Sequence, residues 1–220
     1  MEPRSDIDDL WRRYGEQEAR GDRAAALATL DLFIAKLEAA PADVRAAWLD
    51  EYLITPNEVR VRAPLFRRVL FPELKARYLA GSAGAARALA ELSQELYRYR
   101  EGWEALGWPT AIGLWQEAYR RDPSSELARA QVVESTAGFI RYTLHELPVG
   151  VLYGNDGASI DSCGELMAEL EAFRALLTPA EAERYRDLVA RAAFHYPSYR
   201  EYLQQGRRQG YAAFLAERTQ

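Results

Sequence analysis

The side chains best suited to chemistry gather in one stretch, residues 145–166, between two runs of helical character. A thiol near an imidazole can act as a nucleophile, and a helix N-terminus lowers the pKa of a thiol. These side chains would then line a pocket, under a loop of residues 148–161, in an enzyme or a small-ligand sensor. The residues that carry this hypothesis are His145, Asp156, Asp161 and the single cysteine, Cys163.

The same stretch also has an interpretation without catalysis. The carboxylates do not have the spacing of a calcium-binding loop, and the glycines do not have the spacing of a phosphate-binding loop. Ser162 and Glu165 have the spacing of a capping box at a helix start, and Asn155–Asp156–Gly157 is typical of a tight turn. This interpretation is the favoured one, so we predict no catalytic residue, no metal and no cofactor.

Apolar residues in this loop indicate binding instead. A surface loop that only connects two helices does not need this much apolar area, so we expect part of it to meet a partner. Two tryptophans in the connection over residues 101–110 have the same character, because aromatic side chains are enriched at protein interfaces. The predicted binding residues are Val151, Leu152, Tyr153, Asn155, Trp103 and Trp108.

The elements around these residues are predicted to be helices almost throughout. Apolar residues recur at spacings of three and four, which favours an all-α fold of about ten antiparallel helices in an irregular array. Asp22 is expected to cap one helix, and Thr178 with Glu181 has the pattern of a capping box. Pro72 is expected to interrupt a helix and open the next, and Pro197 to end or kink one.

One helix carries a half-motif of a known repeat. Ala111, Trp115, Ala118 and Pro123 match the second-helix pattern Ala-x3-Phe-x2-Ala-x4-Pro, with tryptophan in place of phenylalanine. In these four residues the chain resembles the tetratricopeptide repeat family. The resemblance implies a solenoid-like array of degenerate helix-hairpin repeats with a concave surface that binds proteins or peptides.

Length and composition fit one helical domain over residues 1–220, with a subdivision near 101–110 as the alternative. The chain has 49% hydrophobic and 28% charged residues and a net charge of −5, which argues against nucleic acid as a partner. No apolar run is long enough for a membrane span, and the N-terminus does not have the pattern of a signal peptide.

Together these features predict a protein- or peptide-binding module without catalysis. A lone cysteine fits a reducing cytoplasm. Nearly all positive charge is arginine, since Lys36 and Lys75 are the only lysines, as in proteins of GC-rich bacteria. We therefore expect a bacterial cytoplasmic protein with an unidentified protein or peptide partner. The alternative is the enzyme or ligand sensor with its pocket under the loop of residues 148–161.

Overall fold

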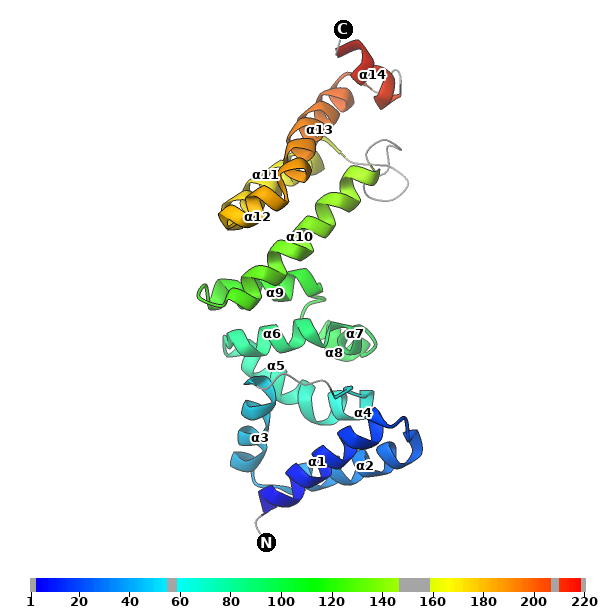
Figure 1. Cartoon of the computed structure of the whole chain (residues 1–220), viewed down its shortest axis with the longest axis vertical. Coiled ribbons are helices and arrows are strands. Elements are labelled where there is room, and N and C mark those ends of the chain that lie inside the picture. Colours follow the sequence, from blue (N-terminus) through cyan, green and yellow to red (C-terminus); the bar gives the residue numbers. More distant parts are fainter. Residues whose placement is uncertain (1–2, 55–58, 147–158, 207–209, 219–220) are drawn as a thin grey trace. The chain divides into compact units, whose positions relative to one another are not determined.

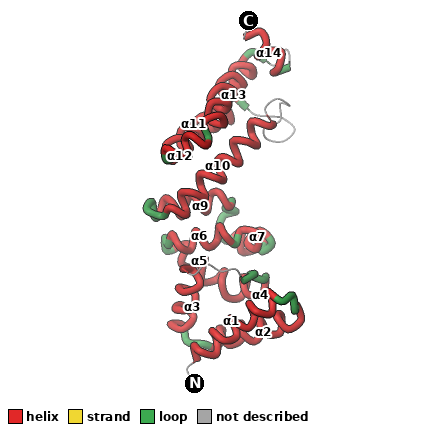
Figure 2. The backbone as a smooth tube through the Cα atoms, viewed as in Figure 1, coloured by secondary structure: helices red, strands yellow, loops and turns green. Residues whose placement is uncertain are grey.

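The fold is all-α, which confirms the prediction from periodicity. In the computed structural model the described residues form helices and connecting loops, and none of them forms a strand (Figure 2). None of the described helices combines the length and the apolar character that crossing a bilayer requires. The residues that the structure describes are 3–54, 59–146, 159–206 and 210–218.

The chain divides into two compact units, Met1–Ala128 and Arg129–Gln220. Residues 101–110, where a subdivision was the alternative to a single domain, lie inside the first unit. That residues 1–220 behave as one domain stays a prediction.

Among its described residues the first unit has ten helical segments of quite different lengths, drawn from blue to green in Figure 1. Helix α1 packs along α2, α5 packs on α6, and α6 packs on α9. The described segments of this unit are α1 (Pro3–Ala19), α2 (Arg23–Ala39), α3 (Ala42–Ile54), α4 (Ala63–Leu65), the π-helix η1 (Phe66–Leu70), α5 (Phe71–Leu79), α6 (Ala83–Glu91), α7 (Ser93–Tyr97), α8 (Arg100–Glu104) and α9 (Ala111–Arg121).

Aromatic side chains from three helices form the core between α1, α2 and α3. The ring of Phe33 is fully buried and lies 5.3 Å from the ring of Trp11 and 5.2 Å from that of Trp48, measured between centroids. The expected cap at the start of α2 is present, because the Asp22 carboxylate accepts a hydrogen bond from the Ala25 amide. Local capping and shared aromatic packing thus set the positions of these three helices.

The second unit is built around α10, whose first residues still belong to the first unit. Its core contains Cys163 and Phe173 on α11, together with the buried tyrosines Tyr196 and Tyr199 on α13. Helix α11 packs along α13. The described helices here are α10 (Glu126–Glu146), α11 (Ile160–Leu176), α12 (Pro179–Arg184), α13 (Arg186–Gln204) and α14 (Tyr211–Arg218).

Caps in the second unit confirm one prediction and correct another. Thr178 and Glu181 form the predicted capping box at the start of α12. Helix α11, however, begins one turn earlier than predicted, since Ser159 caps it by accepting a hydrogen bond from the Ser162 amide. Ser162 and Glu165 therefore lie inside the helix and do not form a capping box. The additional turn places Cys163 on the apolar face of α11, in the core.

Pro197 does not end its helix, because α13 continues through it to Gln204. Proline removes the hydrogen bond that residue 197 would otherwise donate to the Ala193 carbonyl oxygen. One residue later the Ser198 hydroxyl donates to the carbonyl oxygen of Phe194 at 2.7 Å. Tyr196, directly before the proline, and Ser198 and Tyr199, directly after it, are all buried. Their burial on both sides of the proline favours continuation of the helix.

Candidate functional site

The two tryptophans predicted to bind a partner, Trp103 and Trp108, lie in contact in the first unit. Their ring centroids are 4.8 Å apart in an edge-to-face arrangement. Trp103 also packs on Tyr97, at 5.0 Å between centroids. Such pairs stabilise the folded state by about 0.5–1.5 kcal/mol in addition to the free energy gained by burying their apolar area. We call Tyr97, Trp103 and Trp108 the aromatic cluster.

The backbone at the aromatic cluster is strained at one residue. Trp108 has φ of 60°, and it is the only residue other than glycine with positive φ in the described part of the chain. It follows Gly107, which is also left-handed at 76°. A left-handed conformation outside glycine costs on the order of 1–3 kcal/mol and persists only where the surroundings enforce it. Such outliers are frequent at binding sites.

Three hydrogen bonds enforce this conformation. The Trp108 amide donates to the Trp103 carbonyl oxygen at 3.1 Å, and the Trp103 indole N–H donates to the Pro109 carbonyl oxygen at 2.9 Å. The Tyr97 hydroxyl accepts a hydrogen bond from the Ala111 amide at 2.7 Å, at the start of α9. The aromatic cluster is therefore fixed to the helices on both sides of the turn.

Trp108 is the exposed member of the aromatic cluster. It keeps 43% of its surface accessible, whereas Trp103 and Tyr97 are half-buried. The cluster contains no carboxylate, imidazole, thiol or lysine. What it offers is an apolar aromatic surface on a fixed turn, which suits binding and not proton transfer or nucleophilic attack.

Gly102 allows the close packing beneath the aromatic cluster. A Cβ atom there would lie 2.4 Å from Tyr99 Cδ1 and 2.9 Å from Phe71 Cζ. Phe71 is buried, and its ring meets that of Tyr99 edge-to-face at 5.2 Å between centroids. We expect Gly102→Ala to lower the free energy of unfolding by about 1–3 kcal/mol, since overpacking displaces both rings. Denaturant titration followed by circular dichroism measures the change.

Gly138 supplies the matched control for that substitution. It lies inside α10, and a Cβ atom there would meet nothing within 4 Å. Alanine at such a helical position stabilises by about 0.5–1 kcal/mol relative to glycine. Gly138→Ala should therefore raise the free energy of unfolding while Gly102→Ala lowers it. Two variants that change stability in the same direction would contradict the packing argument.

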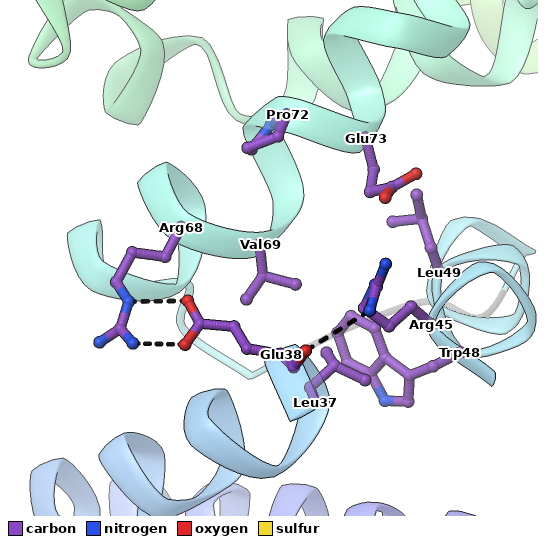
Figure 3. A pocket seen from close by; sticks show the side chains of 9 residues that line it. All are labelled: Leu37, Glu38, Arg45, Trp48, Leu49, Arg68, Val69, Pro72 and Glu73. Carbon is purple, nitrogen blue, oxygen red and sulfur yellow. Dashed lines mark hydrogen bonds and ion pairs between the residues drawn. The ribbon is translucent and has the colours of Figure 1, made fainter. Parts of the chain in front are cut away.

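A second candidate site in the first unit is a pocket of about 270 Å³ between α2, α3 and the η1–α5 segment (Figure 3). Its apolar lining is contributed by all of these elements, and its polar lining consists of two arginines and two glutamates. The apolar residues are Leu37, Trp48, Leu49, Val69 and Pro72, and the charged residues are Glu38, Arg45, Arg68 and Glu73.

The wall of this pocket includes a π-helical turn. Pro72 was expected to interrupt the helix, and the structure widens the preceding turn, so that the Phe71 amide donates to the Phe66 carbonyl oxygen, five residues back. The widened turn accommodates a residue that has no N–H and whose ring crowds the carbonyl four residues before it. It also places Arg68 and Val69 in the pocket wall. Single-turn π-helices are frequent at functional sites.

One charged pair in the pocket is already neutralised. Arg68 donates to both carboxylate oxygens of Glu38, at 3.0 and 2.5 Å, and this bond raises the pKa of Arg68. Arg45 instead donates to the backbone carbonyl oxygens of Ala40 and Glu38, at 2.7 and 3.4 Å. This pocket was not predicted from the sequence. Pro72 within the otherwise helical run of residues 63–79 was its only signal in the sequence.

The described candidates for catalysis are not brought together. The His145 side chain is 83% exposed at the end of α10. Cys163 is buried among apolar side chains, and Asp161 is exposed in the first turn of α11. An exposed imidazole and a buried thiol do not line one common cavity. Among the described residues, no group of three or more His, Cys, Asp or Glu side chains is arranged to hold a metal ion.

The remaining predicted residues lie outside the described part of the chain. They are Asp156 among the catalytic candidates and Val151, Leu152, Tyr153 and Asn155 among the binding candidates. Comparison with models of protein families, with curated proteins and with solved structures found no match for this chain. The aromatic cluster and the pocket, in contrast, are formed entirely by described residues.

Proposed function

We propose that this protein is a non-catalytic module that binds a protein or peptide, with the aromatic cluster as its contact surface. The single observation that carries the proposal is Trp108, an exposed tryptophan held in a left-handed conformation. Both properties cost free energy in the isolated protein. Neither is needed to connect α8 to α9, because a small polar residue would satisfy this turn at lower cost.

Binding would offset that cost. Tryptophan and tyrosine dominate the residues that contribute most to interfaces, and a rigid aromatic anchor loses little conformational entropy on binding. The half-motif on α9 supports the proposal, since the tetratricopeptide-like resemblance implies a surface for peptides. In α9 the side chains of Trp115 and Ala118 are buried, as the second helix of such a repeat requires. A bacterial cytoplasmic setting belongs to the same proposal, because the composition favours it.

The test uses Trp108→Asn, because asparagine tolerates the left-handed conformation. Peptides are selected from a displayed random library against the wild-type protein, and their dissociation constants are then measured for both proteins. We expect binding to weaken by at least about 30-fold, which corresponds to the loss of a contact worth about 2 kcal/mol. Relief of strain and loss of ring contact should offset each other, so that the free energy of unfolding changes by less than about 1 kcal/mol.

Leu32→Ser is the matched control, since Leu32 is 61% exposed on α2 and lies outside the aromatic cluster. This variant should bind the selected peptides like the wild type. The proposal is wrong if the library yields no binding peptide, or if Trp108→Asn binds as well as Leu32→Ser. A melting temperature that drops by many degrees in Trp108→Asn would show that Trp108 serves the core instead.

A further inference from the structure

The pocket between α2, α3 and the η1–α5 segment contains two opposite charges that are not paired with each other. Arg45 extends from α3 and Glu73 from α5 toward the same part of the pocket (Figure 3). No hydrogen bond or ion pair joins these two side chains. Arg45 donates through Nη1 to the backbone carbonyl oxygens of Ala40 and Glu38, and these oxygens carry no formal charge.

The other charges of the pocket do not need a ligand. Arg68 and Glu38 satisfy each other through two hydrogen bonds, at 3.0 and 2.5 Å. The pocket therefore has one guanidinium and one carboxylate left to meet a ligand. A ligand that complements both charges carries a carboxylate for the guanidinium and an ammonium group for the carboxylate.

The apolar lining of the pocket determines which kind of side chain the ligand can carry. Leu37, Trp48 and Leu49 are all less than 5% exposed, so this wall is held by the core and is already formed. The cavity of about 270 Å³ lies at the small end of ligand sites, which suits one large apolar side chain. An aromatic or branched aliphatic group can pack there on the Trp48 ring and on Val69.

From this arrangement we propose that the pocket binds a free α-amino acid with a large apolar side chain. The ligand carboxylate meets Arg45, its ammonium group meets Glu73, and its side chain lies on Trp48 and Val69. A purely apolar ligand would leave both charges without a partner, and a simple carboxylic acid would leave Glu73 facing a like charge. This site goes beyond the proposed peptide-binding function and shares no residue with the aromatic cluster.

Isothermal titration calorimetry on the full chain tests the proposal with L-phenylalanine and L-leucine as probes. Two derivatives of the first probe each remove one charge: phenylalaninamide lacks the carboxylate, and N-acetyl-phenylalanine lacks the ammonium group. We expect saturable binding of both free amino acids and at least about tenfold weaker binding of each derivative, because each loses one charge-assisted contact.

Two variants assign these contacts to their residues. Arg45→Gln should no longer distinguish L-phenylalanine from its amide, and Glu73→Gln should no longer distinguish it from the N-acetyl derivative. Arg12→Gln is the control, since Arg12 pairs with Asp9 on the surface of α1 and should bind all probes like the wild type. The comparison of the derivatives on the wild-type protein does not depend on the stability of any variant.

Three results would overturn the assignment. They are the absence of saturable heat with either amino acid, equal binding of N-acetyl-phenylalaninamide and L-phenylalanine, and unchanged discrimination in Arg45→Gln and Glu73→Gln. Trp108→Asn separates this proposal from the peptide-binding function, since it should bind L-phenylalanine normally while losing the selected peptides. Each proposal is therefore tested by its own measurement, and failure of one does not contradict the other.

Discussion

Replacing Phe33 by alanine is expected to lower the free energy of unfolding by about 3–5 kcal/mol, the range for removing a buried phenylalanine. The ring is fully buried between Trp11 and Trp48, so its removal leaves a cavity among three helices and ends two aromatic contacts. Typical domains are stable by only about 5–15 kcal/mol, so this loss is a large share of the total. Chemical denaturation followed by circular dichroism measures it.

Leu32→Ala is the control for this prediction. It changes the neighbouring residue on α2, whose side chain is 61% exposed, and should shift the free energy of unfolding by less than about 0.5 kcal/mol. A Phe33→Ala variant as stable as Leu32→Ala would contradict the packing of α1, α2 and α3 described above.

Phe173→Ala makes the corresponding change in the second unit, where the ring is buried against Tyr185 at 5.5 Å between centroids. The pair of variants also tests the prediction of a single domain over residues 1–220. If the chain unfolds as one cooperative domain, both variants lower the same transition. Two transitions, each lowered by only one variant, would contradict that prediction and assign separate stability to the two units.

Acid is expected to destabilise the protein through two glutamates with low pKa values. The Arg129 guanidinium, together with the Thr178 amide, lowers the pKa of Glu181 from 4.5 to about 2. Hydrogen bonds from Arg120 and Arg121 lower the pKa of Glu117 to about 2 as well. A carboxylate with a depressed pKa in the folded state contributes stability above pH 4.5. That contribution is lost as the pH falls from 4.5 to 2.

The size of this effect follows from the pKa shifts. A shift of one pKa unit between the unfolded and folded states corresponds to about 1.36 kcal/mol of folding free energy. Solvent screening reduces this value here, because the side chains of Glu181 and Glu117 are 20% and 22% exposed. We expect each carboxylate to contribute about 1–3 kcal/mol. The measurement is the free energy of unfolding from denaturant titrations at pH 7, 5, 3 and 2, where the other carboxylates form a common background.

Glu181→Gln isolates one of these contributions. Glutamine can keep the capping box with Thr178, because its side-chain oxygen still accepts the hydrogen bond from the cap amide. The variant should be less stable than the wild type at pH 7, and the difference should vanish by about pH 2. A difference that is constant from pH 7 to pH 2 would show that ionisation of Glu181 has no part in the stability.

Much of the local structure could be predicted from the sequence alone. The spacing of apolar residues predicted an all-α fold, and the caps at Asp22 and Thr178 were predicted at the residues where they occur. These features depend on neighbours within about one helical turn, so the chain itself contains the necessary information. Where two local solutions compete, the local sequence does not decide between them: either Ser159 or Ser162 could cap α11, and in the structure Ser159 is the cap and Cys163 is buried.

The sites depended on contacts that are distant in sequence. The types of Trp103 and Trp108 indicated binding, but their edge-to-face contact and the left-handed Trp108 are results of the closed turn. His145 and Cys163 looked like a pair because they are near in sequence, yet α10 and α11 leave one exposed and bury the other.

The pocket combines α2, α3 and the η1–α5 segment, and the paired residues Glu38 on α2 and Arg68 on η1 are thirty positions apart. Side-chain type and local periodicity thus determined the helices. Only tertiary packing decided which side chains would meet, because contacts between helices depend on shape and burial over the whole unit.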